Sequence, residues 1–170
     1  MAKAHTTLTQ DLLKELLHYD PDTGVFTCRK TRGNKSAGSV VGSIKTDGYL
    51  GFQLIEKDYR AHRLAWLYMT GEWPEVLIDH KNGNPLDNRF ENLREASHSE
   101  NCQNIKVATK RSKTGFLGVR KMTAPNGRIS FQAAIRVDKQ FIYLGTHPTA
   151  EAAHAAYMAA KRDLHGAYIS

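Results

Sequence analysis

The chain has 170 residues and a formal net charge of +7, and 41% of its residues are hydrophobic, with a mean hydropathy of −0.51. This composition is typical of a globular protein with one domain or two small ones, and no run approaches the ~20 apolar residues of a membrane span. Cys28 and Cys102 form no Cys-x-x-Cys pair, and the first residues lack the apolar core of a signal peptide. We therefore expect a cytoplasmic protein with reduced thiols and no structural zinc site.

The positive charge is unevenly distributed along the chain. Residues 1–105 contain 13 Lys and Arg against 14 Asp and Glu, whereas residues 106–170 contain 11 against 3. A near-neutral part followed by a strongly basic part indicates a catalytic region joined to a module that holds nucleic acid. A generic basic surface is the alternative interpretation.

The first part of the chain predicts a helix, a strand and a loop. Thr9 is a candidate N-cap for a short helix over residues 9–18, in which leucines recur at helical spacing. A turn over residues 19–24 separates this helix from a strand at residues 25–28. Residues 29–39 are rich in Lys, Arg, Gly and Ser, and we expect them to form a mobile loop.

A hairpin and a second helix follow. Thr46-Asp47-Gly48 is a turn signal with a short strand on either side, the second over residues 49–55. The apolar residues near 60–69 predict a helix that Gly71 ends. This helix carries His62, which we interpret as a packing or hydrogen-bonding residue because it lies outside the spaced motif that follows.

The candidate catalytic residues come after this helix. The run Val76-Leu77-Ile78 predicts a short strand, and the pair Asp79-His80 directly follows it. A segment dense in turn formers comes next. Its polar members are interpreted as turn residues: Asn82, Asn84, Asp87 and Asn88.

A second apolar edge and a short helix complete the motif. Phe90 and Leu93 supply the edge, with Asn92 between them. Ser97 or Ser99 can cap a helix that carries Asn101.

These residue types fit the hydrolysis of a phosphodiester. The reaction needs a cation to offset negative charge in the transition state and a base to take a proton from water. The oxygens of Asp79 and Asn101 are hard ligands that suit one Mg²⁺ or Mn²⁺ ion. His80 titrates near neutrality and can accept the proton, while Asn92 can hydrogen-bond either the imidazole or the adjoining loop.

The residues and their intervals resemble the ββα-metal site of HNH endonucleases, in particular the phage and intron-encoded homing type. The resemblance extends over residues 19–104. It implies that Asp79 and Asn101 bind the metal, that His80 is the general base and that Asn92 takes the central Asn position.

The C-terminal part predicts a small sheet followed by one helix. Three strand-like runs follow a basic linker at 105–115, and Thr149 can cap an alanine-rich helix with Gly166 beyond its end. The runs cover residues 118–122, 129–137 and 140–144, with turns at 124–127 and 137–140.

The motifs GVR, FQAAIR, YLGT, TAEAAHAAY and HG in this part resemble the DNA-binding domain of plant ethylene-response-factor (Apetala-two) proteins, over about 115–166. The resemblance implies that the sheet enters the major groove. By motif position Arg120 and Arg136 are the leading DNA contacts, and strand alternation turns Gln132 outward with Arg136. The full set of candidate DNA-binding residues is Arg120, Lys121, Arg128, Gln132, Arg136, Lys139 and Tyr143.

The aromatic positions leave two interpretations open. Phe141 and Tyr143 can pack on DNA sugars and base edges, or they can belong to the core. Leu117, Ala134 and Phe141 depart from the plant pattern, so the plant recognition sequence does not transfer.

Together these observations predict an α+β protein, with a ββα-metal HNH unit followed by a small three-stranded antiparallel sheet packed on one helix. The expected domains are an endonuclease domain at 1–104, with its ββα-metal core at about 76–104, the linker at 105–115 and a DNA-binding domain at 116–170. We expect a metal-dependent endonuclease that acts on double-stranded DNA, as a monomer and without membrane contact. The alternatives are an inactive, sequence-specific DNA-binding regulator and a low-specificity nicking or repair nuclease.

Overall fold

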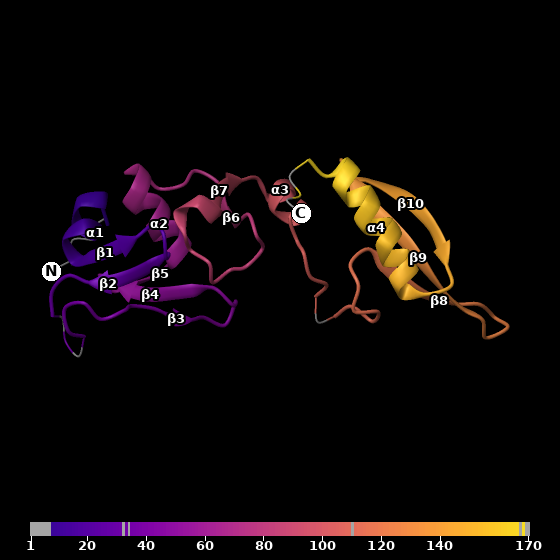
Figure 1. Cartoon of the computed structure of the whole chain (residues 1–170), viewed down its shortest axis with the longest axis horizontal. Helices are drawn as coiled ribbons and strands as arrows, with labels where there is room; N and C mark the ends of the chain where they lie inside the picture. Colours follow the sequence, from indigo (N-terminus) through magenta and orange to yellow (C-terminus); the bar gives the residue numbers. More distant parts are fainter. Residues whose placement is uncertain (1–7, 32, 34, 110, 167, 169–170) are drawn as a thin grey trace, which may run out of the picture. The chain divides into compact units, whose positions relative to one another are not determined.

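The computed structural model describes residues 8–31, 33, 35–109, 111–166 and 168, and it is a mixed α and β structure (Figure 1). The chain forms two compact units, Met1–His98 and Ser99–Ser170. The predictions for the first seven residues, for two positions of the loop at 29–39 and for Lys110 fall outside the described residues. No helix in the described part of the chain is both long enough and apolar enough to cross a membrane.

The described residues of the first unit form two helices, a short 3₁₀ helix and three small antiparallel sheets, with strand orders β1-β2, β3-β4-β5 and β6-β7. A third helix, α3, begins at the unit boundary. These elements are α1 (Gln10–Leu16), β1 (Leu17–Asp20), β2 (Val25–Cys28), β3 (Ser43–Ile44), β4 (Leu50–Leu54), β5 (Lys57–Arg60), α2 (Ala61–Thr70), β6 (Leu77–His80), η1 (Phe90–Asn92), β7 (Leu93–Ala96) and α3 (His98–Gln103).

The first helix is shorter than the sequence predicts. The Thr9 side chain caps α1 by accepting a hydrogen bond from the backbone N–H of Leu12, as expected. The predicted helix extends to residue 18, but Leu17 and His18 instead begin β1, where they pair with β2. The ladder of β1 and β2 satisfies their backbone groups, and so tertiary pairing overrides the leucine spacing that favoured a helix.

Strand β5 was missed because its turn has an unusual sequence. Ile55 and Glu56, between β4 and β5, both have positive φ angles, 49° and 63°. A two-residue hairpin turn of this kind is normally marked by Asn-Gly or Asp-Gly, so Ile-Glu carries no turn signal. Asp138 and Lys139 adopt the same left-handed conformation between the later strands β9 (Ile129–Val137) and β10 (Gln140–His147).

An aromatic and aliphatic core holds the first unit together. The rings of Tyr19 and Phe26 lie 4.6 Å apart between centroids, and Phe26 contacts Phe52 edge-on at 5.5 Å. Ile78 from β6 and Leu93 from β7 belong to the same buried cluster. The β6–β7 hairpin is therefore anchored on the core, and this anchoring limits the movement of the polar side chains beside those two residues.

The second unit contains an antiparallel sheet of order β10-β9-β8 and the helix α4 (Ala150–Leu164) (Figure 1). The strands are β8 (Val119–Thr123), β9 (Ile129–Val137) and β10 (Gln140–His147). Ala133, Ile135 and Ala153 are fully buried where α4 packs on the sheet. A Cβ on Gly118 would lie 1.9 Å from the Tyr157 ring, so this contact between helix and sheet requires glycine.

Candidate active site

Asp79 and His80 lie within strand β6, not after it as the sequence suggests. Antiparallel pairing places Asp79 opposite Arg94 and His80 opposite Leu93 on β7. Both polar side chains are almost completely buried, with 6% and 4% of their surface exposed. Because both residues lie in a paired strand, the hydrogen bonds between β6 and β7 fix their backbone positions.

The Asp79 carboxylate forms an ion pair with Arg94. Nε and Nη2 of the guanidinium both donate to Oδ2, at 3.0 and 2.8 Å. The positive guanidinium offsets the cost of burying the carboxylate. Arg94 was not expected at this site, and only the strand register brings it to Asp79.

His80 is enclosed by an amide and two aromatic rings. Its Nε2 lies 3.3 Å from Oδ1 of Asn88. The His62 ring meets the His80 ring edge-on at 5.2 Å, and the Tyr49 ring lies at 5.9 Å. Burial lowers the pKa of His80 below its usual value, while the hydrogen bond with Asn88 and the negative charge of Asp79 act in the opposite direction. The imidazole is therefore neutral at physiological pH, the state that a general base requires.

His62 lies directly beside His80, although the sequence places it outside the motif. It is buried, and its Nδ1 is enclosed without a hydrogen-bond partner among the described residues. Burial, together with the neighbouring His80, lowers the pKa of His62 to about 3. His62 is thus a neutral ring that packs against both Tyr49 and His80.

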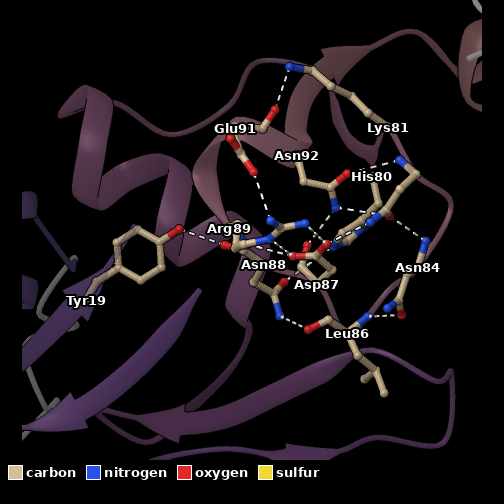
Figure 2. A network of polar contacts seen from close by, with 11 residues as sticks. Tyr19, His80, Lys81, Asn84, Leu86, Asp87, Asn88, Arg89, Glu91 and Asn92 are labelled. Atoms are coloured by element: carbon tan, nitrogen blue, oxygen red, sulfur yellow. Dashed lines mark hydrogen bonds and ion pairs between the residues drawn. The ribbon is translucent and has the colours of Figure 1, made fainter. Parts of the chain in front are cut away.

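Asn92 ties together the loop between β6 and β7. Its Oδ1 accepts from the backbone N–H of Asn82 at 3.0 Å. Its Nδ2 donates to Oδ1 of Asn82 at 3.1 Å. The same Nδ2 donates to the backbone oxygen of Asp87 at 2.8 Å, and Figure 2 shows Asn92 beside Asp87. The sequence left two hydrogen-bond partners open for Asn92, the His80 imidazole and the adjoining loop. The structure shows hydrogen bonds to the loop.

Asn88 is a site residue that the sequence interpretation missed. Its side chain is 1% exposed and contacts His80 through Oδ1, while its Nδ2 donates to the backbone oxygen of Leu86 at 3.2 Å (Figure 2). The Tyr19 hydroxyl donates to the backbone oxygen of Asn88 at 2.6 Å. Because asparagine is common in turns, the residue type alone did not indicate that Asn88 would be buried against His80.

A salt bridge on the loop supports this arrangement. The Arg89 guanidinium donates to both carboxylate oxygens of Asp87, at 2.8 and 2.7 Å. These hydrogen bonds lower the pKa of Asp87 to about 2. Asp87 therefore stays ionised at physiological pH and holds Arg89 in place.

Asn101, the second predicted metal ligand, belongs to α3, in the unit that begins at Ser99. Within the residues that the structure covers, no three His, Cys, Asp or Glu side chains gather as a metal-binding group. A cation at Asp79 would therefore need amide, water or phosphate oxygens as further ligands. Such a donor set fits Mg²⁺ or Mn²⁺ and does not fit structural zinc.

The family comparison bears on this segment. Residues 59–103 match the HNH endonuclease family model. The match supports an HNH nuclease that acts on DNA and agrees with the prediction from Asp79, His80 and Asn92. No curated protein and no solved structure matched the chain.

The C-terminal sheet presents a second group of predicted residues on the face opposite α4. Strand pairing aligns Arg120 with Gln132, Arg136 with Phe141 and Ala134 with Tyr143. Residues paired in this way share a face of the sheet, and the buried Ala133 and Ile135 show that the other face meets α4. We call Arg120, Gln132, Arg136, Phe141 and Tyr143 the outer-face group.

The outer-face aromatics are exposed and do not join the core. Phe141 and Tyr143 are 76% and 61% exposed. The Arg136 guanidinium lies 5.5 Å from the centroid of the Phe141 ring. This cation–π contact holds the guanidinium over the sheet surface.

Three other candidates lie elsewhere. Lys121 pairs with Phe131, and so it is on the side of the sheet that faces α4, although its side chain is exposed. Arg128 and Lys139 are exposed residues of the turns that join the strands. The structure therefore groups Arg120, Gln132, Arg136 and Tyr143 and leaves these three residues outside that group.

Proposed function

We propose that this protein is a metal-dependent DNA endonuclease of the phage HNH homing type. The observation that carries the proposal is the pair in β6, within the segment that matches HNH endonucleases: a buried carboxylate and, next to it, a buried neutral imidazole. In this proposal His80 is the general base, and Asp79 with Asn101 holds one Mg²⁺ or Mn²⁺ ion.

In this proposal each residue of the site has a separate role. His80 takes a proton from the water that attacks the phosphorus, and the bond to the 3′-oxygen breaks as the new bond forms. The bound cation would supply positive charge to the phosphate and to the departing 3′-oxygen. Asn92 keeps the β6–β7 loop closed beside the base, and Arg94 orients the Asp79 carboxylate.

We further propose that the domains divide at the basic linker over residues 105–115 and that the C-terminal sheet positions the enzyme on duplex DNA. The excess positive charge of residues 106–170 and the exposed outer-face group support this role. One site per chain makes a nick the basic event, and a double-strand cut requires two such events.

A cleavage assay tests the proposal. Supercoiled plasmid and phage genomic DNA are incubated with Mg²⁺, Mn²⁺ or EDTA and with either wild type or His80→Ala. We expect metal-dependent nicking or cutting, reduced about 10²–10⁴-fold by His80→Ala, because general bases contribute on that order. DNA binding by the variant stays near the wild-type level.

Two results would contradict the proposal. If His80→Ala cleaved at a comparable rate, His80 would not be the base. If wild type bound DNA tightly but cleaved no substrate, the inactive-regulator alternative would replace it. Footprinting then separates homing from low-specificity nicking, since homing predicts one protected site and the other predicts diffuse protection.

A further inference from the structure

We propose that Asn88 is a positioning residue that holds His80 in one tautomer, and that the β1–β2 hairpin holds Asn88. The inference rests on the proposed role of His80 as general base, and it extends the site beyond the matched segment, which begins at residue 59. Asn88 touches neither substrate nor metal in this proposal and acts through the imidazole.

The orientation of the Asn88 amide follows from its partners. The backbone carbonyl of Leu86 can only accept a hydrogen bond, so the amide nitrogen must face it. The amide oxygen therefore faces Nε2 of His80, at 3.3 Å. An amide oxygen cannot donate, and so the hydrogen bond requires a proton on Nε2.

This hydrogen bond selects the tautomer of the base. A neutral imidazole carries one proton, and with that proton on Nε2 the lone pair is on Nδ1. Nδ1 is then the nitrogen that takes the proton from water. In the opposite tautomer Nε2 and the Asn88 oxygen would both be acceptors in a buried place, a repulsive arrangement that disfavours it.

The hairpin of β1 and β2 fixes the backbone on which Asn88 sits. Tyr19 donates its hydroxyl proton to the Asn88 carbonyl at 2.6 Å, and Phe90 donates its N–H to the Pro21 carbonyl at 3.1 Å. Gly24 lies against the same segment. Its φ angle is +73°, and a Cβ there would lie 2.5 Å from the Asn88 carbonyl carbon and from the Arg89 nitrogen.

These contacts make Asn88 more than a filler of buried space. A filler needs only the right volume, which leucine also has. A positioning residue needs the acceptor oxygen, which aspartate retains and leucine lacks. The two substitutions therefore separate a steric role from the proposed one.

The test is ¹⁵N NMR of the imidazole nitrogens in the full chain, without metal or DNA, at a pH where His80 is neutral. Wild type should show a protonated Nε2 and an unprotonated Nδ1. Asn88→Asp keeps an acceptor at Nε2 but loses the donor to Leu86, and its carboxylate favours the charged imidazole, so it should show the same tautomer only at a pH high enough to leave His80 neutral. Asn88→Leu should show mixed tautomers, with kcat for plasmid cleavage about 10–100-fold lower and KM unchanged. Asn88→Asp should recover part of that loss.

The support from the hairpin is tested separately. Tyr19→Phe removes only the hydroxyl and should shift the His80 nitrogen signals toward mixed tautomers. The matched control Tyr59→Phe, elsewhere in the same unit, should not. Gly24→Ala should have the larger effect, because its Cβ would collide with backbone.

The outcomes distinguish this inference from the proposed function. A wild-type His80 protonated on Nδ1, or an Asn88→Leu variant with the wild-type tautomer and the wild-type kcat, would overturn the role of Asn88. If the tautomer were as expected but wild type cleaved no DNA, the positioning would stand and the nuclease proposal would fail.

Discussion

The site on β6 and β7 and the outer face of the C-terminal sheet solve opposite physical problems. Asp79, His80, Asn88 and Asn92 are buried, and each is hydrogen-bonded to protein groups. The outer-face group exposes two aromatic rings and its arginines to solvent. A reacting group must hold one geometry before the substrate arrives, whereas a DNA-binding surface must leave charge accessible to the phosphates and bases. Packing therefore defines the first region, and accessible charge defines the second.

The largest effect on stability is expected from breaking the buried ion pair. Arg94→Leu leaves the Asp79 carboxylate buried beside an apolar side chain, and it should lower the free energy of unfolding by about 3 kcal/mol. Urea denaturation measures this change. The double variant Asp79→Asn with Arg94→Leu serves as the control, because it removes both charges and should recover much of the loss. If Arg94→Leu were as stable as wild type, the ion pair would contribute nothing to the free energy of unfolding.

On the outer face the expected effect is on binding and not on stability. Arg136→Ala should weaken binding to a specific DNA site by about 1–3 kcal/mol and reduce its salt dependence, because one cationic contact is lost. Stability should change by less than about 0.5 kcal/mol, since the side chain is exposed. Lys139→Ala, in the adjacent turn, is the matched control and should have a smaller effect. Fluorescence anisotropy at several salt concentrations measures both, and equal losses would contradict the grouping.

The smallest expected effect on stability comes from the Asp87–Arg89 salt bridge in the loop between β6 and β7. The Arg89 guanidinium lowers the pKa of Asp87 from the ordinary value of 3.8 to about 2 in the folded protein. A lowered pKa stabilises the fold above pH 3.8, and this contribution is lost as the pH falls toward 2. Because Arg89 is partly exposed, we expect only about 1 kcal/mol.

Asp87→Asn provides the measurement for that contribution. Chemical denaturation of both proteins between pH 2 and pH 6 should give a difference in unfolding free energy that is present at pH 6 and vanishes near pH 2. A difference independent of pH would show that the ionised carboxylate of Asp87 is not its source.

Much of the local structure follows from the sequence for identifiable reasons. Thr9 and Thr149 were recognised as helix caps because a side-chain acceptor at that position satisfies a backbone N–H of the first turn. The turn at Thr46-Asp47-Gly48 was predicted because glycine readily adopts the left-handed backbone that turns require, and Gly48 has a φ angle of +86°. Strand β5 was not predicted because Ile55 and Glu56 form a left-handed turn, a conformation that these residue types rarely adopt.

The sequence by itself determined which residues could do chemistry: the order Asp79, His80, Asn92 and Asn101, and the basic character of the C-terminal part, depend only on residue type and spacing. The tertiary structure decided which groups meet. It paired Arg94 with Asp79 across two strands, set His62 against His80, and placed Asn88 on the imidazole, with Tyr19 behind it. Most of these contacts join residues far apart in the chain, and Asn88 contacts His80 although asparagine at such a position is usually only a turn residue. The contacts depend on strand register and core packing, which a local sequence pattern does not specify.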